Sequence, residues 1–237
     1  MKIASCEHIT LLDDKTPCDI YYLDIIVDSI SDDAKSLISI ISENSWINQL
    51  DPVSKVSFET KVKATASELV KLFTTQSLQN TVSEEFGEYM ISLHSLESLK
   101  TQLNHKEFPL AELWKEKIKN NHGFDFHTET PEQLLSFGEA KYISNGNAYG
   151  RAAEQVVRFI SDDEKKDYGD LLYLKNLNAS DESVYRLLND GKRCFAMGFS
   201  VNSNNLELIK KNALKNTDIR TLVNKAQTLY LIGVHIQ

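Results

Sequence analysis

Cysteine is scarce in this sequence: its 237 residues include only three, Cys6, Cys18 and Cys194. They form no CxxC pair and no even-numbered framework, which excludes a disulfide scaffold and indicates reduced thiols. The histidines at 94, 105 and 122 have no zinc-ligand spacing to any cysteine. A structural zinc site is therefore not expected.

Long apolar runs are also missing. No run approaches the roughly 20 residues that a membrane span needs, and residues 1–15 lack the apolar core of a signal peptide. Residues 144–150 contain glycine but not the GK[ST] ending of a phosphate-binding loop, so nucleotide hydrolysis is not expected here. We predict a cytoplasmic protein without a membrane segment, in which any use of ATP belongs to a partner.

Basic residues are fewer than acidic ones: 26 Lys and Arg face 34 Asp and Glu, and the formal net charge is −8. Such a charge argues against tight, unaided binding to nucleic acid. The imbalance is uneven, because residues 1–60 are mainly acidic and residues 185–237 mainly basic. This asymmetry predicts different partners for the two ends, although an ordinary solvated surface explains any single charge equally well.

The first part of the chain predicts a strand followed by a helix. Residues 20–27 are rich in aromatic and β-branched side chains, as strands are, and a helix opened by Ser31, Asp32 and Asp33 follows. Pro52 breaks the chain, and residues 54–73 could begin as a strand and end as a helix. We assign residues 1–75 to an N-terminal α+β region that could bind a partner.

Residues 81–100 predict a helix. Thr81 and Glu84 have the spacing of a capping box, and apolar residues recur at steps of three and four: Val82, Phe86, Tyr89, Met90, Leu93 and Leu96. Further elements give the order of an α/β protein: helices over 110–120 and 148–160, and strands at 123–127, 134–143, 193–201 and 229–236.

A pair of opposite charges lies in the apolar strand predicted at 134–143. Glu139 and Lys141 are two residues apart, so in a strand their side chains project from the same face. Burying such a pair is costly unless something compensates. Asp125 lies upstream between two phenylalanines, which indicates that its carboxylate is also partly enclosed.

These residues suit the metal-dependent hydrolysis of a phosphodiester. The carboxylates of Asp125 and Glu139 are hard oxygen ligands for Mg²⁺ or Mn²⁺, and the carbonyl of Ala140 could add another ligand. Lys141 would stabilise the attacking water or the charge that develops on the phosphate. We therefore predict a metal site at Asp125, Glu139 and Ala140, with Lys141 as a further catalytic residue.

Simpler interpretations stay open. Glu139 and Lys141 could form an ion pair on an exposed edge strand, and Asp125 could be a turn or capping residue. His127 is either a satisfied structural histidine or part of the site. One face of the helix predicted at 148–160 could point towards phosphate or towards solvent: Arg151, Gln155 and Arg158.

The pattern resembles the PD-(D/E)xK nuclease superfamily, in which an aspartate precedes a strand bearing (D/E)-x-K. Phe124 stands where the proline of that motif is usual. The stretch from Glu85-Phe86-Gly87-Glu88 through Gly123-Phe124-Asp125 to residues 137–142 looks like the nuclease subunit of the Hachiman anti-phage defence system. It also looks like a related abortive-infection nuclease encoded beside a helicase. The resemblance covers roughly residues 80–200.

The resemblance implies a PD-(D/E)xK nuclease core, a mixed central sheet flanked by helices, over residues 76–237. It implies a DNA-degrading effector that a superfamily 2 helicase partner restrains until abnormal or invading DNA is sensed. A glutamate of the preceding helix often joins the site in that superfamily, and Glu88 is the matching candidate. Helical geometry instead places Glu85 nearer the apolar stripe, so the two arguments disagree.

Three functions follow as alternatives. The first is an Mg²⁺- or Mn²⁺-dependent deoxyribonuclease. The second is a catalytically silent nuclease-fold module that binds DNA ends or the helicase, which the negative net charge slightly favours. The third is a scaffold or antitoxin-like protein that uses the acidic N-terminal region.

Overall fold

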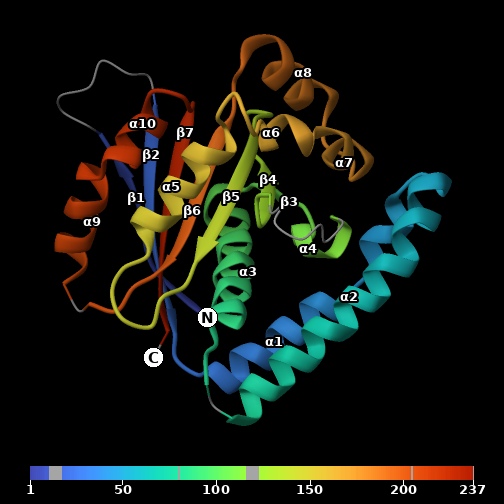
Figure 1. Cartoon of the computed structure of the whole chain (residues 1–237), viewed down its shortest axis with the longest axis horizontal. Coiled ribbons are helices and arrows are strands. Elements are labelled where there is room, and N and C mark those ends of the chain that lie inside the picture. Colours follow the sequence, from blue (N-terminus) through green and yellow to red (C-terminus); the bar gives the residue numbers. More distant parts are fainter. Residues whose placement is uncertain (11–17, 80, 116–122, 204, 237) are drawn as a thin grey trace.

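Seven strands of the computed structural model form one mixed sheet (Figure 1). The structure describes residues 1–10, 18–79, 81–115, 123–203 and 205–236. The order across the sheet is β1 (Lys2–Ile9), β2 (Asp19–Val27), β7 (Thr228–Ile236), β6 (Cys194–Ser200), β5 (Leu135–Lys141), β4 (Phe126–Glu129) and β3 (Lys106–Glu107). The four central strands β2, β7, β6 and β5 are parallel, and the outer three pair antiparallel with their neighbours. The predicted α/β class is confirmed.

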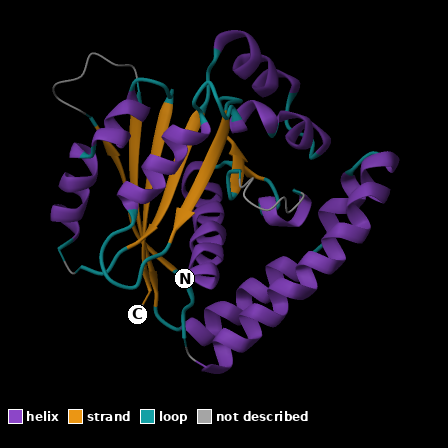
Figure 2. Ribbon diagram, in the orientation of Figure 1, coloured by secondary structure: helices purple, strands orange, loops and turns teal. Residues whose placement is uncertain are grey.

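Helices cover both faces of the sheet (Figure 2). Helix α3 (Glu84–Leu103) lies behind the sheet in Figure 1 and contacts β4, β5, β6 and β7. Helices α5 (Tyr149–Phe159) and α10 (Thr217–Val223) cover the front face, and α9 (Leu206–Lys215) packs beside α10. Every residue of β6 is buried, as expected for a parallel strand with helices on both sides.

The helical hairpin of the first third of the chain extends away from the sheet (Figure 1). It consists of α1 (Ile30–Ser42), the 3₁₀ helix η1 (Ser45–Gln49) and the long α2 (Pro52–Gln79). The alternative left open for residues 54–73, a strand followed by a helix, is resolved in favour of helix throughout. Pro52 begins this helix, where its fixed φ and missing N–H are tolerated, and the buried side chains of α2 recur at helical steps: Phe58, Val62, Ala66, Leu69 and Phe73.

Two helix starts differ from their predicted positions. The prediction of a capping box at Thr81 and Glu84 is wrong. Ser83 is the N-cap of α3, and its Oγ accepts a hydrogen bond from the N–H of Phe86. Helix α1 likewise starts one residue early: Ser29 is its N-cap and bonds the N–H of Asp32. Serine satisfies a free backbone donor in both cases.

The remaining predicted elements of the second half are confirmed within a few residues. The exception is the helix predicted at 110–120, which is wrong beyond its first turn: α4 spans only Ala111–Trp114 and ends at Lys115, whose backbone is extended (φ −77°, ψ 149°). Residues 116–122, which include His122, lie outside the described residues. The mixed helical region contains α6 (Lys166–Gly169), α7 (Leu171–Asn176) and α8 (Asp181–Asp190). No helix in the described ranges combines the length and apolarity that crossing a membrane requires.

The N-terminal strands are part of the same sheet as the later ones. β2 pairs with β7 from Asp19↔Thr228 to Val27↔Ile236, and β1 pairs with β2. The strands of the first 27 residues therefore share a sheet with those of residues 76–237, and only the α1–α2 hairpin stands apart. The boundary at residues 75 and 76 stays a prediction.

Gly198 in β6 allows α3 to pack directly on the sheet. A Cβ at this position would lie 2.6 Å from Ile91 Cγ2 and 2.7 Å from Ser95 Oγ of α3. We expect Gly198→Ala to lower the free energy of unfolding by about 1–3 kcal/mol, the usual cost of overpacking a core. Gly169→Ala is the matched control, because nothing lies within 4 Å of its added Cβ. Chemical denaturation measures both, and equal stabilities would contradict the close packing of α3 on β6.

Candidate active site

The predicted catalytic residues lie near the point where β5 is no longer paired with β4. β4 begins at Phe126, opposite Gly138, so the last residues of β5 have no strand partner on that side. Asp125 takes the place of that partner: its Oδ2 accepts a hydrogen bond from the N–H of Ala140 at 2.8 Å. A carboxylate thus replaces a strand at this edge of β5.

The backbone of Asp125 is held from two sides. Its N–H donates to the carbonyl of Gly138 at 2.8 Å, and its carbonyl accepts from the N–H of Ala111 at the start of α4 at 3.1 Å. Together with the side-chain bond to Ala140, these contacts fix both the position and the direction of the carboxylate. Desolvation raises the pKa of Asp125, against the opposing effect of Lys141.

Glu139 projects from β5 into a fully buried environment. Its Oε1 forms an ion pair with Nζ of Lys141 at 2.7 Å but does not have regular hydrogen-bond geometry, and Oε2 has neither an ion-pair nor a hydrogen-bond partner within the described part of the chain. Burial raises the pKa of Glu139 well above its usual range, and the nearby charge of Asp125 adds to the effect. A buried carboxylate oxygen without a donor is energetically costly, so the site favours an additional positive charge.

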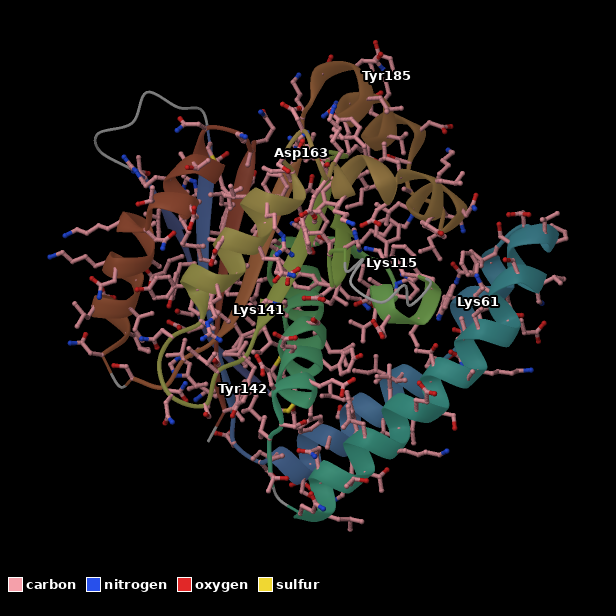
Figure 3. All side chains as sticks on the ribbon, in the orientation of Figure 1. Lys61, Lys115, Lys141, Tyr142, Asp163 and Tyr185 are labelled. Carbon is pink, nitrogen blue, oxygen red and sulfur yellow. The ribbon has the colours of Figure 1, made fainter. Side chains whose placement is uncertain are left out.

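Glu88 reaches this cluster from α3. Its Oε1 is 3.2 Å from Nζ of Lys141, whereas Glu85 is exposed. The approach of α3 depends on Gly87, where a Cβ would collide with the ring of Tyr142. Lys141 and Tyr142 lie where β5 and α3 come together (Figure 3). The geometry therefore brings Glu88, not Glu85, to Lys141, while its catalytic role stays a prediction.

Lys141 is held as a cation. Burial alone would lower the pKa of its amine, but the carboxylates of Glu139, Asp125 and Glu88 raise this pKa above its ordinary value. An ammonium group in this state donates hydrogen bonds and supplies positive charge, and it does not accept a proton at neutral pH. The ammonium group of Lys141 can therefore stabilise an anion.

A second charged network, which the sequence did not reveal, lies behind Asp125. Nζ of Lys115 donates to Oδ2 of Asp170 at 2.6 Å and to the carbonyl of Phe124 at 2.9 Å. His127 is fully buried, and its Nε2 is 2.9 Å from the same Asp170 oxygen. Burial alone would raise the pKa of Asp170, but His127 and Lys115 hold it below its usual value.

This network holds the carbonyl of Phe124, the residue before Asp125, and accounts for the burial of His127. The prediction left open whether His127 is structural or catalytic, and the geometry gives it a structural partner in Asp170. Positions 115, 127 and 170 are far apart in the sequence and form no motif. Only the fold could identify them as neighbours. Of the three α5 residues that could face phosphate, Arg151, Gln155 and Arg158, the last is already paired with Glu164 at 3.2 Å.

The donor set for a metal ion is small. The described residues contain no group of three or more His, Cys, Asp and Glu side chains placed to share a metal ion. The predicted site has two carboxylates, Asp125 and Glu139, and the backbone carbonyl of Ala140. In a strand, the N–H and C=O of one residue point to the same side, so the Ala140 carbonyl faces the Asp125 side of β5. The unpartnered Oε2 of Glu139 fits a divalent cation that keeps several waters, as Mg²⁺ does.

Asp170→Asn should destabilise the fold, because it leaves Lys115 without its buried counter-charge. We expect the free energy of unfolding at pH 7 to fall by about 3 kcal/mol. The pKa of Asp170 is held low in the folded state. The extra stability of the native protein over Asp170→Asn is therefore fully present above the ordinary carboxyl pKa of about 4, and it decreases as the pH falls below that value.

The exposed Asp163 (Figure 3) offers a control with the same change of charge, Asp163→Asn, for which we expect no more than about 0.5 kcal/mol. Urea denaturation between pH 3 and 7 measures both variants. A loss at Asp170 that does not depend on pH would contradict the role of its charge.

Comparison with protein-family models and with curated proteins found no match to this chain. The interpretation of the site therefore rests on the geometry of Asp125, Glu139, Lys141 and Glu88 and on the resemblance of their spacing to the nuclease motif.

Proposed function

We propose that this chain is a metal-dependent DNA nuclease of the PD-(D/E)xK type, which hydrolyses phosphodiester bonds with Mg²⁺ or Mn²⁺. One observation carries the proposal: Asp125, Glu139 and Lys141 meet at the unpaired edge of β5, and one buried carboxylate oxygen there has no hydrogen-bond donor in the described part of the chain. The further proposal of a cytoplasmic anti-phage effector restrained by a superfamily 2 helicase rests on the sequence resemblance alone.

The proposed centre combines two carboxylates and one carbonyl: Asp125, Glu139 and Ala140. A divalent cation bound there would lower the pKa of a water molecule and offset the negative charge of the phosphate. Asp125 is already fixed by three hydrogen bonds, so it would not need to reorganise when the cation binds. The burial of Glu139 excludes water from one side of the centre.

Lys141 and Glu88 have distinct parts in the proposed chemistry. Nζ of Lys141 would donate hydrogen bonds to the attacking water or to a phosphate oxygen and so stabilise negative charge as it develops. Glu88 holds this ammonium group from the side of α3, at 3.2 Å. We therefore assign Glu88 as a positioning residue for Lys141 rather than as a metal ligand.

The second candidate is a catalytically silent module that binds DNA ends or the helicase. Two observations favour it: the net charge of −8, and the lack of a three-side-chain metal group among the described residues. A silent module would bind DNA or the helicase equally well with Glu139 native or substituted. It would cleave no DNA in either form. The same purified variants therefore separate the two candidates.

Substitution of Glu139 tests the nuclease directly. We expect Glu139→Gln to lower the rate of Mn²⁺-dependent plasmid cleavage at least about 100-fold, because it removes a charged ligand while keeping the shape of the side chain. Lys141→Met should cause a similar loss, since it removes the charge that stabilises the transition state.

The matched control is Glu68→Gln on the outer surface of α2, which makes the same change at an exposed position. Nicking and linearisation of supercoiled plasmid are measured with and without the helicase partner. Cleavage by Glu139→Gln at the rate of the Glu68→Gln control would refute the proposed centre. No cleavage by the native chain in any state would support the silent module.

Cleavage by the isolated chain should fall steeply with salt. Because the chain is acidic overall, its contact with DNA depends on a few local cations, and each phosphate contact adds to the salt dependence. We expect at least about a tenfold lower rate at 200 mM than at 50 mM monovalent salt at subsaturating DNA, and a weaker dependence when a partner delivers the DNA. Equal rates for the isolated chain at both salt concentrations would contradict this expectation.

A further inference from the structure

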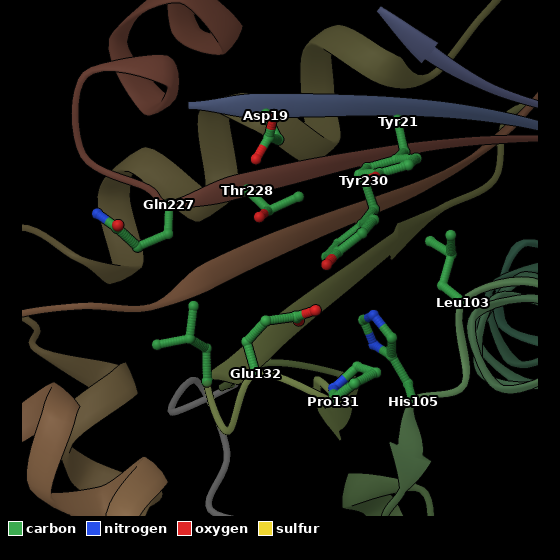
Figure 4. Close-up of a pocket in the computed structure, with 10 residues that line it drawn as sticks. Asp19, Tyr21, Leu103, His105, Pro131, Glu132, Gln227, Thr228 and Tyr230 are labelled. Atoms are coloured by element: carbon green, nitrogen blue, oxygen red, sulfur yellow. The ribbon is translucent and has the colours of Figure 1, made fainter. Parts of the chain in front are cut away.

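A pocket of about 290 Å³ opens at the amino-terminal ends of the parallel strands, away from the carboxyl end of β5 where the candidate active site lies (Figure 4). Its floor comes from β2 and β7, whose register pairs Asp19 with Thr228 and Tyr21 with Tyr230, so that all four side chains face the same side of the sheet. The end of α3 and the turn before β5 form its walls.

The floor of the pocket is aromatic. The rings of Tyr21 and Tyr230 are stacked, with centroids 5.8 Å apart, and the ring of His105 meets Tyr230 edge-on at 4.9 Å. Tyr230 is 4% exposed, whereas Tyr21 is partly exposed. Tyrosine faces carry negative electrostatic potential, so such a floor attracts cations.

His105 adds a buried polar group to the wall. The residue is only 4% exposed, and its Nδ1 is bonded to Oγ1 of Thr128 at 2.8 Å. Its Nε2 has no hydrogen-bond partner in the ranges that the structure describes, and the ring lines the pocket (Figure 4). Burial lowers the pKa of His105 to about 4, so the ring is neutral at pH 7 and brings no positive charge to the pocket.

The charged side chains of the pocket are both acidic: Asp19 and Glu132, with no Lys or Arg among the lining residues that the structure describes. The Glu132 carboxylate makes no ion pair or hydrogen bond within the described chain. The guanidinium group of Arg186 donates to the backbone carbonyl of Glu132 and pairs with Glu182 at 2.7 Å. The other carboxylate, that of Asp19, lies 2.9 Å from Nε2 of His8, which is outside the lining. Among the described lining residues, Glu132 is therefore the acidic group without a counter-charge.

We propose that this pocket binds a small organic cation carrying a guanidinium or ammonium group, which lies against the tyrosine rings and bonds the acidic rim. The stacked rings supply a face for the cation, the carboxylates supply its counter-charge, and Nε2 of His105 supplies a further polar contact. The volume is at the lower end of the range for ligand sites, which limits the occupant to a small molecule or to a single side chain. The proposal does not depend on the nuclease activity.

The test uses the full chain and three probes of similar shape: n-butylguanidinium, n-butylammonium and the neutral n-butylurea. Chemical shifts of the tyrosine ring protons give the dissociation constant of each. We expect at least one cation to bind about tenfold or more tightly than the urea, which retains the shape and the N–H groups but lacks the charge. Equal binding of all three probes would overturn the proposal.

Substitutions then locate the binding. Glu132→Gln should weaken the cation about tenfold without altering the fold, because this side chain is exposed. Asp19→Asn is the second variant, and Glu68→Gln on α2 is the control with the same loss of charge. Equal weakening by Glu68→Gln would mean that the cation follows the overall negative charge, and the pocket would be rejected.

A blocked Gly-Arg-Gly peptide and its citrulline counterpart distinguish the source of the cation. If the free guanidinium binds as well as the arginine peptide, the pocket takes a small molecule. If the arginine peptide binds at least about tenfold more tightly than both the free guanidinium and the citrulline peptide, the occupant is an arginine side chain of another protein. Either result supports a cation site, whereas equal binding of the arginine and citrulline peptides and of the neutral urea would reject it.

Discussion

The hydrogen bond from the Ala140 N–H to the Asp125 carboxylate determines the arrangement of the candidate site. Strand pairing between β4 and β5 ends at Phe126 and Gly138, so the last residues of β5 need another partner for their backbone groups. A carboxylate provides that partner and at the same time lies beside the Ala140 carbonyl and the Glu139 side chain. A longer β4 would satisfy the same N–H with a backbone carbonyl and would fill this space with a strand. The geometry of the candidate site therefore depends on β4 starting no earlier than Phe126.

The charge balance at this edge explains why the site favours a cation. Three carboxylates, those of Asp125, Glu139 and Glu88, surround one ammonium group, and the pKa of each carboxylate is raised mainly by desolvation. Lys115 lies nearby, but Asp170 neutralises most of its effect. An excess of buried negative charge lowers the stability of a protein. The cluster is therefore costly to the fold, and this cost is one of the observations that support the proposed function.

The sequence predicted those parts of the fold and site that depend on local pattern. The strand carrying Glu139 and Lys141 was predictable from its apolar residues. The spacing of two residues between Glu139 and Lys141 then placed both side chains on one face of that strand. The long α2 was not, since its β-branched residues suggested a strand and its buried positions show only against α1 and α4. Periodicity pointed to Glu85, whereas the resemblance favoured Glu88, which is the residue that contacts Lys141. The helical-wheel argument assumed that the apolar stripe faces the site, whereas Glu88 meets Lys141 at the sheet edge. Contacts such as Lys115 with Asp170, 55 residues apart, need the fold itself.

The same charges set conditions for cleavage by the proposed nuclease. A phosphodiester carries a negative charge, and in the described part of the chain it would meet the carboxylates of Asp125, Glu139 and Glu88, with the ammonium group of Lys141 held directly against them. A divalent cation held by Asp125 and Glu139 in the proposed centre would offset this negative charge and so favour the approach of a phosphate. Because the chain as a whole is also negative, DNA gains little from long-range attraction. Cleavage by the proposed nuclease would then need two separate conditions: a cation at the edge of β5, and a means of bringing DNA to a protein with a negative net charge. A helicase that already holds DNA would meet the second condition without any change at the site.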